Sequence, residues 1–481
     1  MIVQTAWQGT FTFLEQLPIV VEPSQAQLSS DAGLLPIRQF DEKVGLTRRF
    51  AEALDDPRQP LLVEHSVAEM TRSRIYGILA DYEDQNDHDV LRADPIFKLL
   101  AGRSPEDDDL ASQPTLSRFE NSINIPSLVR LRDLFIDEFI ASFKTPPTRI
   151  TLDLDAVDDP VHGAQQLALF HGYFGQYQYF PAFITCAEND LFVTVSLRPG
   201  MVPASLGVDD DLRHLVPRLR QAFPGVRIVV RGDAGYGVPT MYNACEELLI
   251  DYTFGIGANN VLKARSDQLL QQAVAAFERT QAPQRLFDAF WYQAGSWSHA
   301  RWVIVKAEAN SLGTNRRFVV SNRPGARIVF EPAYDDYALR GESENRNKEI
   351  KCDLAMDRMS DHRFLANYFR LYLHAAAMNL LVRLRGAIVL PTPAPAGDVP
   401  ASALAGEQRQ AFFRARRRRD PLGEGHPGTW RSLLIKVAAE VITRTRRIVV
   451  RLSSTWPHLN RYAELTRQIG HRFVPTPSLS G

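Results

Sequence analysis

The sequence predicts a mixed α/β protein that is divided into several domains. Three observations support this prediction. Residues 149–249 have the pattern of three strands, a helix, a strand and a helix; a helical region precedes them, and a segment rich in aromatic and β-branched residues follows. With 481 residues the chain is also too long for one ordinary hydrophobic core, so two to four domains are expected.

The N-terminal part is predicted to be helical after a short arm. Residues 1–30 alternate weakly, as short strands or an arm would, and 1–34 are predicted to be the N-terminal arm. Residues 35–145 have the periodicity of several short helices and are predicted to be a helical DNA-binding region. The expected helices are 40–54, 63–82, 88–101, 114–120 and 126–143. A short helix after Ser112, with Pro114 in its first turn, suits a DNA groove, but an ordinary helical bundle explains it equally well.

The first core strand carries two carboxylates on one face. Alternation along residues 149–155 separates three aliphatic side chains from Thr151, Asp153 and Asp155. Two carboxylates on one face of an apolar strand are costly unless a cation lies beside them. Further strands are expected at 183–187, 191–197 and 226–233, and helices at 209–223 and 239–249.

This order of elements is that of the ribonuclease H-like fold. One aspartate, Asp155, lies on the first strand, and another, Asp233, ends the fourth. Residues 146–258 are therefore predicted to be the first part of such a core. Glu344 follows Asp233 by 111 residues, which is too far for a compact connection. Residues 259–330 are accordingly predicted to form an inserted β-rich subdomain.

Residues 331–388 are predicted to return to the core, with an amphipathic helix pattern at 364–385. Read as one helix, the segment before it places Tyr337, Arg340, Glu344 and Lys351 within about 60° of one another. A tyrosine, two cations and a carboxylate in line suit a polyanion held beside a metal. A solvated helix face with ordinary ion pairs is the alternative interpretation.

The C-terminal part is basic. A linker with a basic run is predicted at 389–429, with Pro and Ala at 390–400 and arginines at 414–419, and a basic region at 430–481. From residue 401 onward, 15 Lys and Arg stand against 5 Asp and Glu, a balance of +10, whereas the first 400 residues have a balance of −11. A basic tail on an acidic body is typical of nucleic-acid binding.

Composition also indicates the compartment. Cys186, Cys245 and Cys352 are far apart and lack metal-ligand spacing, which indicates a reducing compartment and no zinc site. No apolar run approaches the length of a membrane span, and the N-terminus lacks the build of a signal peptide. We therefore expect a cytoplasmic protein with no membrane partner.

Three acids in the order Asp155, Asp233 and Glu344 could hold metal ions. Cleavage of a phosphodiester requires in-line attack on a charged phosphate, and two Mg²⁺ ions about 3.5–4 Å apart can activate the nucleophile and stabilise the leaving oxygen. Mg²⁺ prefers hard oxygen ligands, so carboxylates from separate elements must converge. His162 and His171 lie near the first acid in sequence but are expected to be structural or to face DNA.

The spacing Y-x2-R-x3-E-x6-K of Tyr337, Arg340, Glu344 and Lys351 resembles the signature of DDE-type insertion-sequence transposases of bacteria. Residues 152–172 (LDLDAVDDPVHGAQQLALFHG) and 231–235 (RGDAG) are similar to one branch, transposase DDE domain group 1. Residues 82–89 (YEDQNDHD) and 110–121 (LASQPTLSRFEN) are similar to the same branch, so the resemblance covers most of the chain.

The resemblance implies a DNA transposase that binds the terminal inverted repeats of its insertion sequence and catalyses metal-dependent strand cleavage and strand transfer. It implies Mg²⁺, for which Mn²⁺ can substitute, held by Asp155, Asp233 and Glu344. Tyr337, Arg340 and Lys351 would contact DNA phosphates near the cut. The implied partners are double-stranded DNA, as transposon ends and target, and a second copy when two ends are synapsed; bound to DNA, the protein would associate with the nucleoid.

Two points in the sequence leave alternatives open. The family usually has Thr two residues after the first catalytic aspartate, where this chain has Val157. A catalytically inactive DNA-binding protein of transposase descent is therefore the alternative function, and a metal-dependent nuclease without strand transfer is a weaker one. Asp153 and Asp155 share a strand face; we assign the metal to Asp155 and expect Asp153 to orient a basic side chain such as Lys351.

Overall fold

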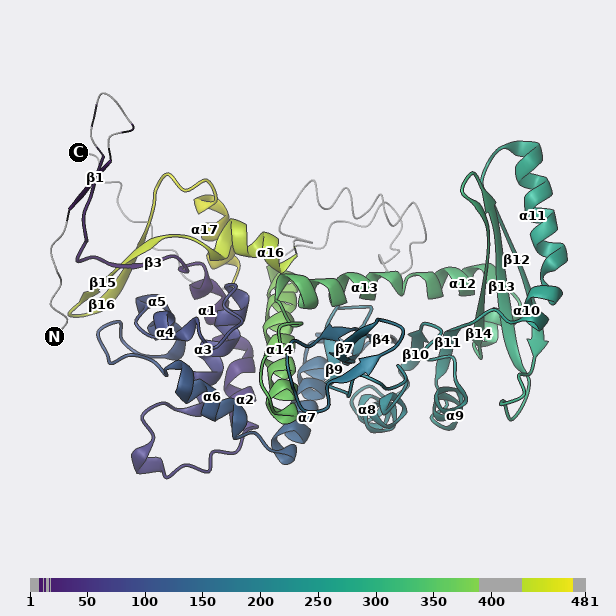
Figure 1. The fold of residues 1–481 in the computed structure, drawn as a ribbon, viewed down its shortest axis with the longest axis horizontal. Coiled ribbons are helices and arrows are strands. Elements are labelled where there is room, and N and C mark those ends of the chain that lie inside the picture. The colour runs from purple at the N-terminus through teal and green to yellow at the C-terminus, as the bar shows by residue number, and fades with distance from the viewer. Residues whose placement is uncertain (1–7, 12, 14–16, 18, 389–425, 470–481) are drawn as a thin grey trace.

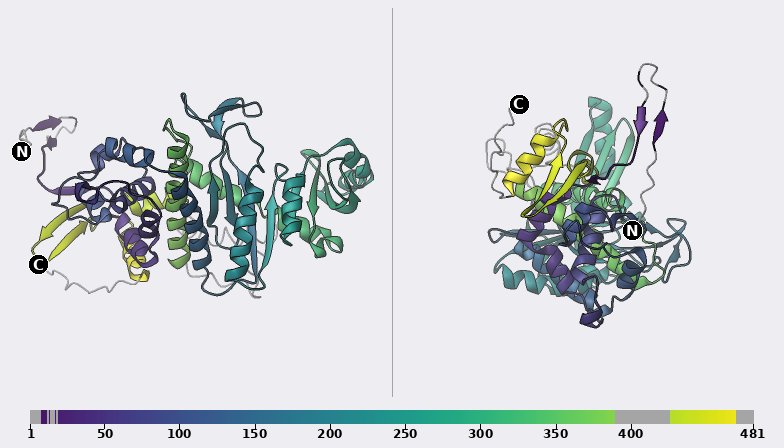
Figure 2. Two further views of the ribbon diagram at one scale, coloured as in Figure 1. Left: turned by 90° about the horizontal axis from the view of Figure 1, so that it is seen from below. Right: turned by 90° about the vertical axis from the view of Figure 1, so that its left-hand side faces the viewer.

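The computed structural model describes residues 8–11, 13, 17, 19–388 and 426–469. It confirms the mixed α/β class. A long helix, α14 (Phe364–Ile388), stands between a helical N-terminal part and a large mixed sheet (Figures 1 and 2). The described residues include no helix that is both long and apolar enough to span a membrane.

The large sheet has eight strands in the order β12-β13-β14-β11-β10-β4-β8-β9. In chain order they are β4 (Arg149–Ala156), β8 (Ala182–Cys186), β9 (Phe192–Ser196), β10 (Arg227–Gly232), β11 (Asp251–Ile256), β12 (Gln284–Tyr292), β13 (Arg301–Asn310) and β14 (Gly313–Ser321). β10 pairs in parallel with β4 on one side and with β11 on the other, and every other pairing in the sheet is antiparallel. The carboxyl ends of β4, β10 and β11 therefore meet at one edge of the sheet.

The segment predicted as an inserted β-rich subdomain extends this same sheet. Its three strands β12, β13 and β14 join through the antiparallel pairing of β14 with β11. The segment begins with two helices that the sequence analysis did not expect, α10 (Asn260–Arg265) and α11 (Asp267–Thr280). Ala273 of α11 is fully buried and clusters with Ala307 and Ala309 of β13, so small side chains let the helix lie close to the strand.

The two faces of the central strands differ in chemistry, as alternation along β4 predicts. The apolar face is covered by α8 (Val208–Ala222) and α9 (Pro239–Glu247), and the polar face by α12 (Phe330–Ala338) and α13 (Gly341–Lys348) (Figure 1). α8 buries Leu212, Leu215 and Leu219, which recur at helical spacing. The helices over the polar face carry the charges that the strand carboxylates require.

The N-terminal part forms helices, as predicted, but with different bounds. They are α1 (Leu34–Val44), α2 (Leu46–Glu52), α3 (Val67–Leu79), α4 (His88–Leu91), α5 (Pro95–Ala101), α6 (Gln113–Asn121) and α7 (Ile125–Ala141). The single helix predicted at 40–54 is wrong, because Gly45, at φ 74°, ends α1 and starts α2. Ser66 and Glu69 form a capping box that starts α3.

α14 confirms the helix predicted at 364–385, but its burial is not that of an amphipathic helix. Most of its residues are buried, because α3 and α6 pack on one side and α7 and β9 on the other. Its Arg370 donates to Glu120 of α6 at 2.6 Å, and Arg74 of α3 donates to the same carboxylate at 2.7 Å. All three charges are buried, and their pairing ties the N-terminal helices to α14.

The described C-terminal residues return to the N-terminal arm. β15 (Ala439–Arg444) and β16 (Arg447–Leu452) form a hairpin, and β15 also pairs with β3 (Gln27–Ser29) of the arm. Helix α17 (Leu459–Gln468) contacts the arm as well, since the Tyr462 hydroxyl donates to the carbonyl of Ala32 at 3.3 Å. The predicted linker at 390–400 and the arginine run at 414–419 lie outside the described residues.

Candidate active site

Asp155 and Asp233 lie at the ends of adjacent parallel strands. In the register of β4 and β10, Arg231 stands opposite Asp153 and Gly232 opposite Leu154, so Asp233 follows directly beside Asp155. Asp233 is held by its own turn, because its carboxylate accepts a hydrogen bond of 2.8 Å from the amide of Gly235. Two acids that are 78 residues apart in the chain thus meet at one edge of the sheet.

The environment of Asp155 disfavours its negative charge. The pKa of Asp155 is raised to about 6, mainly by burial and in smaller part by the neighbouring carboxylates of Asp233 and Glu344, while the Arg340 guanidinium opposes the shift. The amide of Asn347 donates to the Asp155 carboxylate at 2.8 Å, and an Arg340 nitrogen lies 3.4 Å away. Arg340 contacts both Asp155 and Glu344, and Asp233 follows beside Asp155 in the strand register, so the three carboxylates lie around one part of the sheet edge.

The helical segment above this edge is broken into three pieces. α12 ends at Ala338, α13 runs from Gly341 to Lys348, and a π-helical turn, η3 (Glu349–Asp353), follows. Arg340 stands at the junction of α12 and α13, and its guanidinium bridges Asp155 and Glu344, with 3.0 Å to the latter. The Glu344 side chain is 62% exposed, so Arg340 is what holds it toward the site.

Tyr337 reaches the second acid. A Cβ atom at Gly255 of β11 would lie 2.9 Å from the Tyr337 hydroxyl and 3.0 Å from the amide nitrogen of Ala234, next to Asp233. Glycine at this position therefore leaves room for the tyrosine beside the Asp233 turn. Burial raises the pKa of Tyr337, and the Asp233 carboxylate adds to the shift. The hydroxyl is thus a neutral donor at neutral pH.

Lys351 does not pair with Asp153, contrary to the expectation from the sequence. Its ammonium lies 3.0 Å from the carboxylate of Asp158 and 2.8 Å from the carbonyl oxygen of the same residue. The π-helical turn carries Lys351 away from a strictly helical position, toward the loop that follows β4. The structure therefore brings Tyr337, Arg340 and Glu344 to the acids, and Lys351 to the neighbouring loop.

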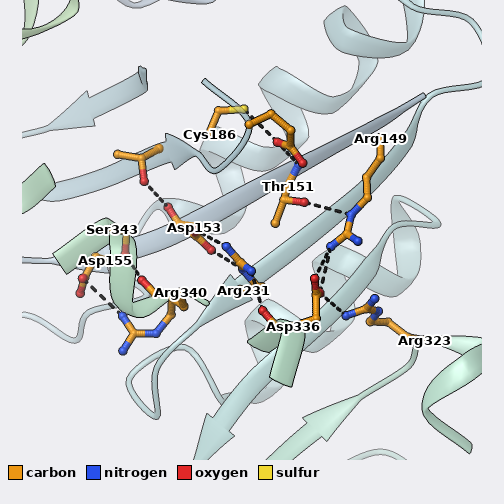
Figure 3. A network of polar contacts seen from close by, with 12 residues as sticks. Arg149, Thr151, Asp153, Asp155, Cys186, Arg231, Arg323, Asp336, Arg340 and Ser343 are labelled. Atoms are coloured by element: carbon orange, nitrogen blue, oxygen red, sulfur yellow. Dashed lines mark hydrogen bonds and ion pairs between the residues drawn. The ribbon is translucent and has the colours of Figure 1, made fainter. Parts of the chain in front are cut away.

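Asp153 pairs with Arg231 instead (Figure 3). The guanidinium of Arg231 donates to both carboxylate oxygens of Asp153 and, through its third nitrogen, to the carbonyl of Asp336 in α12 at 2.5 Å. The Asp336 carboxylate in turn accepts hydrogen bonds from Arg149, at 2.9 and 3.0 Å, and from Arg323. These contacts join β4, β10 and α12 under the segment that carries Tyr337.

The sequence analysis missed three residues of this site: Asn347, Arg231 and Asp336. The sequence did contain a signal for Arg231. It precedes Asp233 by two residues on one strand, so its side chain lies on the same face of the sheet as Asp153 and Asp155. Local pattern gave no signal for Asn347 or Asp336, because their partners are distant in the sequence. Asn347 contacts Asp155, which is 192 residues away, and Asp336 contacts Arg149, which is 187 residues away.

The donor set suits a hard cation. Arg340 places one positive charge between two of the three carboxylates, and carboxylate oxygens are the ligands that hard divalent cations prefer. In the present conformation, the described residues contain no group of three or more His, Cys, Asp or Glu side chains close enough to hold a metal ion.

Two other sequence features have a structural explanation. Val157, where the family has threonine, packs partly buried against the hydrophobic core, and its amide bonds the carbonyl of Pro181 at 3.1 Å. His171 lies among aromatic rings, 4.9 Å from Phe174 and 5.5 Å from Phe180 between ring centroids.

Comparison with known proteins identifies the family. The model of the family described as transposase DDE domain group 1 matches residues 11–396, so the chain belongs to this family of transposases, and the resemblance to this family is confirmed. No curated protein matches the chain significantly. Among solved structures, the synaptic complex of piggyBac transposase with hairpin DNA is similar, with a TM-score of 0.40 and 10% identity, over 95% of this chain and 90% of that chain.

Proposed function

We propose that this chain binds the terminal inverted repeats of its own insertion sequence and catalyses metal-dependent DNA strand cleavage and strand transfer. Membership of the DDE transposase family supports DNA transposition and recombination as the class of function. The observation that carries the proposal is the meeting of Asp155 and Asp233 at one sheet edge, with Arg340 and Glu344 directly above them.

The proposal includes a ribonuclease H-like core. Strands β9, β8 and β4 are antiparallel neighbours, and β10 and β11 follow β4 in parallel, which supports the order of elements expected from the sequence. In this arrangement one acid comes from the first core strand and one from the fourth. α12 and α13 would then be the helical element that supplies the third acid, after the inserted strands β12–β14.

DDE transposases typically use a divalent metal ion. In this chain the side chains of Asp155, Asp233 and Glu344 would hold it. We propose that the ion is Mg²⁺ and that Mn²⁺ can replace it. When bound, the metal would activate the attacking oxygen and stabilise charge on the leaving oxygen. Asn347 donates to Asp155 and so fixes the direction in which that carboxylate points.

The cations of the site are proposed to contact DNA phosphates. Arg340 is bonded to two carboxylates without DNA, and we infer that it turns toward a phosphate when substrate and metal occupy the site. Tyr337 would donate its neutral hydroxyl beside Asp233. Lys351, bonded to Asp158, lies at the flank and would meet the backbone farther from the cut.

The partners of this function are double-stranded transposon ends and target DNA, and the reaction on two ends suggests a dimer in the synapsed state. A catalytically inactive DNA-binding protein of transposase descent is the second candidate. Val157 favours it, because the hydroxyl that the family has near the first acid is replaced by an aliphatic side chain packed on the core.

Two substitutions test the catalytic proposal. Asp233→Ala and Glu344→Ala should each abolish Mg²⁺-dependent nicking of a duplex that contains the element's end, because each removes a metal ligand, while binding of that duplex persists. Glu331→Ala, an exposed acid on α12, is the matched control and should nick normally. Normal nicking by either site variant would refute the ligand assignment, and a folded wild type that binds ends without nicking them would favour the inactive alternative.

A further inference from the structure

An exposed aromatic hairpin projects from the chain just after the first acid. We call residues 167–177 the aromatic hairpin; it comprises β6 (Leu169–His171), the first part of β7 (Gln176–Tyr179) and the turn between them. With β5 (Asp159–Pro160) these strands form a small separate sheet, which projects beside the large one (Figure 2). The proposed function does not use this element.

The surface of the aromatic hairpin is unusually apolar. Tyr173 is 87% exposed, Tyr177 60%, Phe170 48% and Phe174 39%. No Asp, Glu, Lys or Arg occurs between residues 160 and 187. The contact of apolar rings with water costs free energy. A cluster of exposed rings with no charged residue among them therefore indicates a surface that binds a partner.

The base of the hairpin is firmly anchored, so its tip is presented in one orientation. The Tyr179 hydroxyl donates to the carbonyl of Gln166 at 2.8 Å, and the amide of Gln166 donates to the carbonyl of His362 at 2.9 Å. A Cβ atom at Gly200 would stand 1.9 Å from the carbonyl of Gln178, so only glycine lets this loop close against β7. The rings of Phe170 and Tyr177 pack edge to face, 5.5 Å between centroids.

The hairpin adjoins the acidic edge of the large sheet. β5 begins four residues after Asp155, and its Asp159 pairs with Tyr179 of β7. Asp158, between the two, is the residue that binds Lys351 of the helical segment above the site. The hairpin therefore rises from the loop that directly follows the first acid and that Lys351 contacts.

The chemistry of the rings favours nucleic-acid bases as their occupant. A surface without Lys or Arg does not neutralise phosphate charge, whereas aromatic side chains stack on unpaired bases of any sequence. A second copy of the chain is the competing occupant. A stable dimer buries about 800 Å² on each partner from some 20–30 residues, and one short hairpin offers far fewer.

We propose that the aromatic hairpin stacks on unpaired DNA bases beside the cleavage site, with Tyr173 as its principal contact. The proposal rests on the proposed function, since it assigns the surface next to that site to the same substrate. Bases next to a cut strand are less constrained by pairing, and a stacking platform there would hold the flank in position without reading its sequence.

The test compares two single-stranded oligonucleotides of about 20 nucleotides, longer than common single-strand site sizes, one all-thymine and one abasic throughout. The full chain should bind the thymine oligonucleotide more tightly than the abasic one. Tyr173→Ala should weaken thymine binding about tenfold, which is about 1.4 kcal/mol, and leave abasic binding unchanged. Tyr173→Trp should retain the difference, and Leu312→Ala, which alters another fully exposed apolar residue, should behave as wild type.

Three results would overturn the proposal, and each has a distinct meaning. Equal binding of both oligonucleotides by wild type removes base stacking but leaves the proposed function intact. Failure of wild type to bind either oligonucleotide or an end-containing duplex removes both. A dimer of wild type in sedimentation without DNA that Tyr173→Ala converts to monomer would assign the aromatic hairpin to a second copy instead.

Discussion

The carboxylate of Asp153 accepts two hydrogen bonds from the guanidinium of Arg231, at 2.6 and 2.7 Å, and both side chains are buried. Asp155, two residues farther along the same strand face, is bound less closely by a cation: its carboxylate lies 3.4 Å from Arg340, accepts a hydrogen bond of 2.8 Å from the amide of Asn347, and has a raised pKa. Arg231 thus meets the charge of Asp153 in a bidentate pair, whereas the charge of Asp155 faces a more distant guanidinium that Glu344 shares. This difference separates a structural acid from a candidate metal ligand.

Asp155→Asn and Asp153→Asn should therefore fail in different ways. Asp155→Asn should eliminate metal-dependent nicking and leave stability intact or slightly raised, because it removes a carboxylate whose charge burial disfavours. Asp153→Asn should lower the free energy of unfolding by about 3–5 kcal/mol, because it leaves the Arg231 charge buried without its partner. Denaturant unfolding and nicking per folded molecule measure the two effects. Nicking by folded Asp155→Asn, together with its loss in folded Asp153→Asn, would reverse the assignment.

Arg340→Ala and Lys351→Ala should each weaken binding of an end-containing duplex and lower the salt slope of binding by about one, since each removes one phosphate contact. Arg340→Ala should also reduce nicking, because the guanidinium holds Glu344 toward Asp155. Titrations at several salt concentrations measure the slope, with Arg279→Ala, an exposed arginine of α11, as the control. If neither site variant changes slope or cleavage, these residues serve only the ion pairs seen without DNA.

Local periodicity sufficed to predict the core elements of this site. Alternation along residues 149–155 correctly placed Asp153 and Asp155 on one face, because neighbouring side chains of a strand must point to opposite sides. The strand predicted at 226–233, which has three consecutive β-branched residues and ends at an aspartate, forms as β10 and lies beside β4 as a parallel neighbour. These features depend on a few adjacent residues, which a single sequence displays.

Features that depend on distant packing were not predictable in the same way. The partner of Asp153 was expected to be Lys351, but Arg231 lies opposite in the strand register, and a π-helical turn takes Lys351 to Asp158. The pattern of α14 predicted a helix but not its burial on all sides, since that depends on which elements pack around it. Helix breaks such as that at Gly45 depend on one residue's positive φ.

The buried His374 of α14 should make the fold sensitive to acid. Burial and the nearby Arg74 and Arg370 lower the pKa of His374 to about 3. Between pH 6.5 and 3 the unfolded chain binds a proton that the folded chain excludes, so stability is full above pH 6.5 and is lost as the pH falls. The contribution of His374 to this loss should be about 2 kcal/mol at pH 5.

His374→Leu should remove that part of the pH dependence. Denaturant unfolding of wild type and variant at pH 7 and pH 5 measures it, with His299→Gln as the control, since the His299 side chain is 56% exposed. Identical losses between the two pH values in wild type and His374→Leu would show that this histidine does not contribute to acid sensitivity.

The hairpin of β15 and β16 should add DNA affinity through phosphate neutralisation. Arg444 ends β15, Arg447 starts β16 and Arg446 lies in the turn between them; all three are exposed, and no carboxylate in the part of the chain that the structure describes is paired with them. Because each phosphate contact releases counterions, replacing all three by Gln should lower the salt slope of duplex binding by up to about three and weaken affinity without changing the pattern of cleavage. Arg451→Gln is the matched control on the same hairpin, since that side chain already pairs with Glu440 at 3.4 Å and should contribute less. Duplex titrations at several salt concentrations decide the matter: an unchanged slope in the triple variant would show that the basic balance of the C-terminal part acts elsewhere.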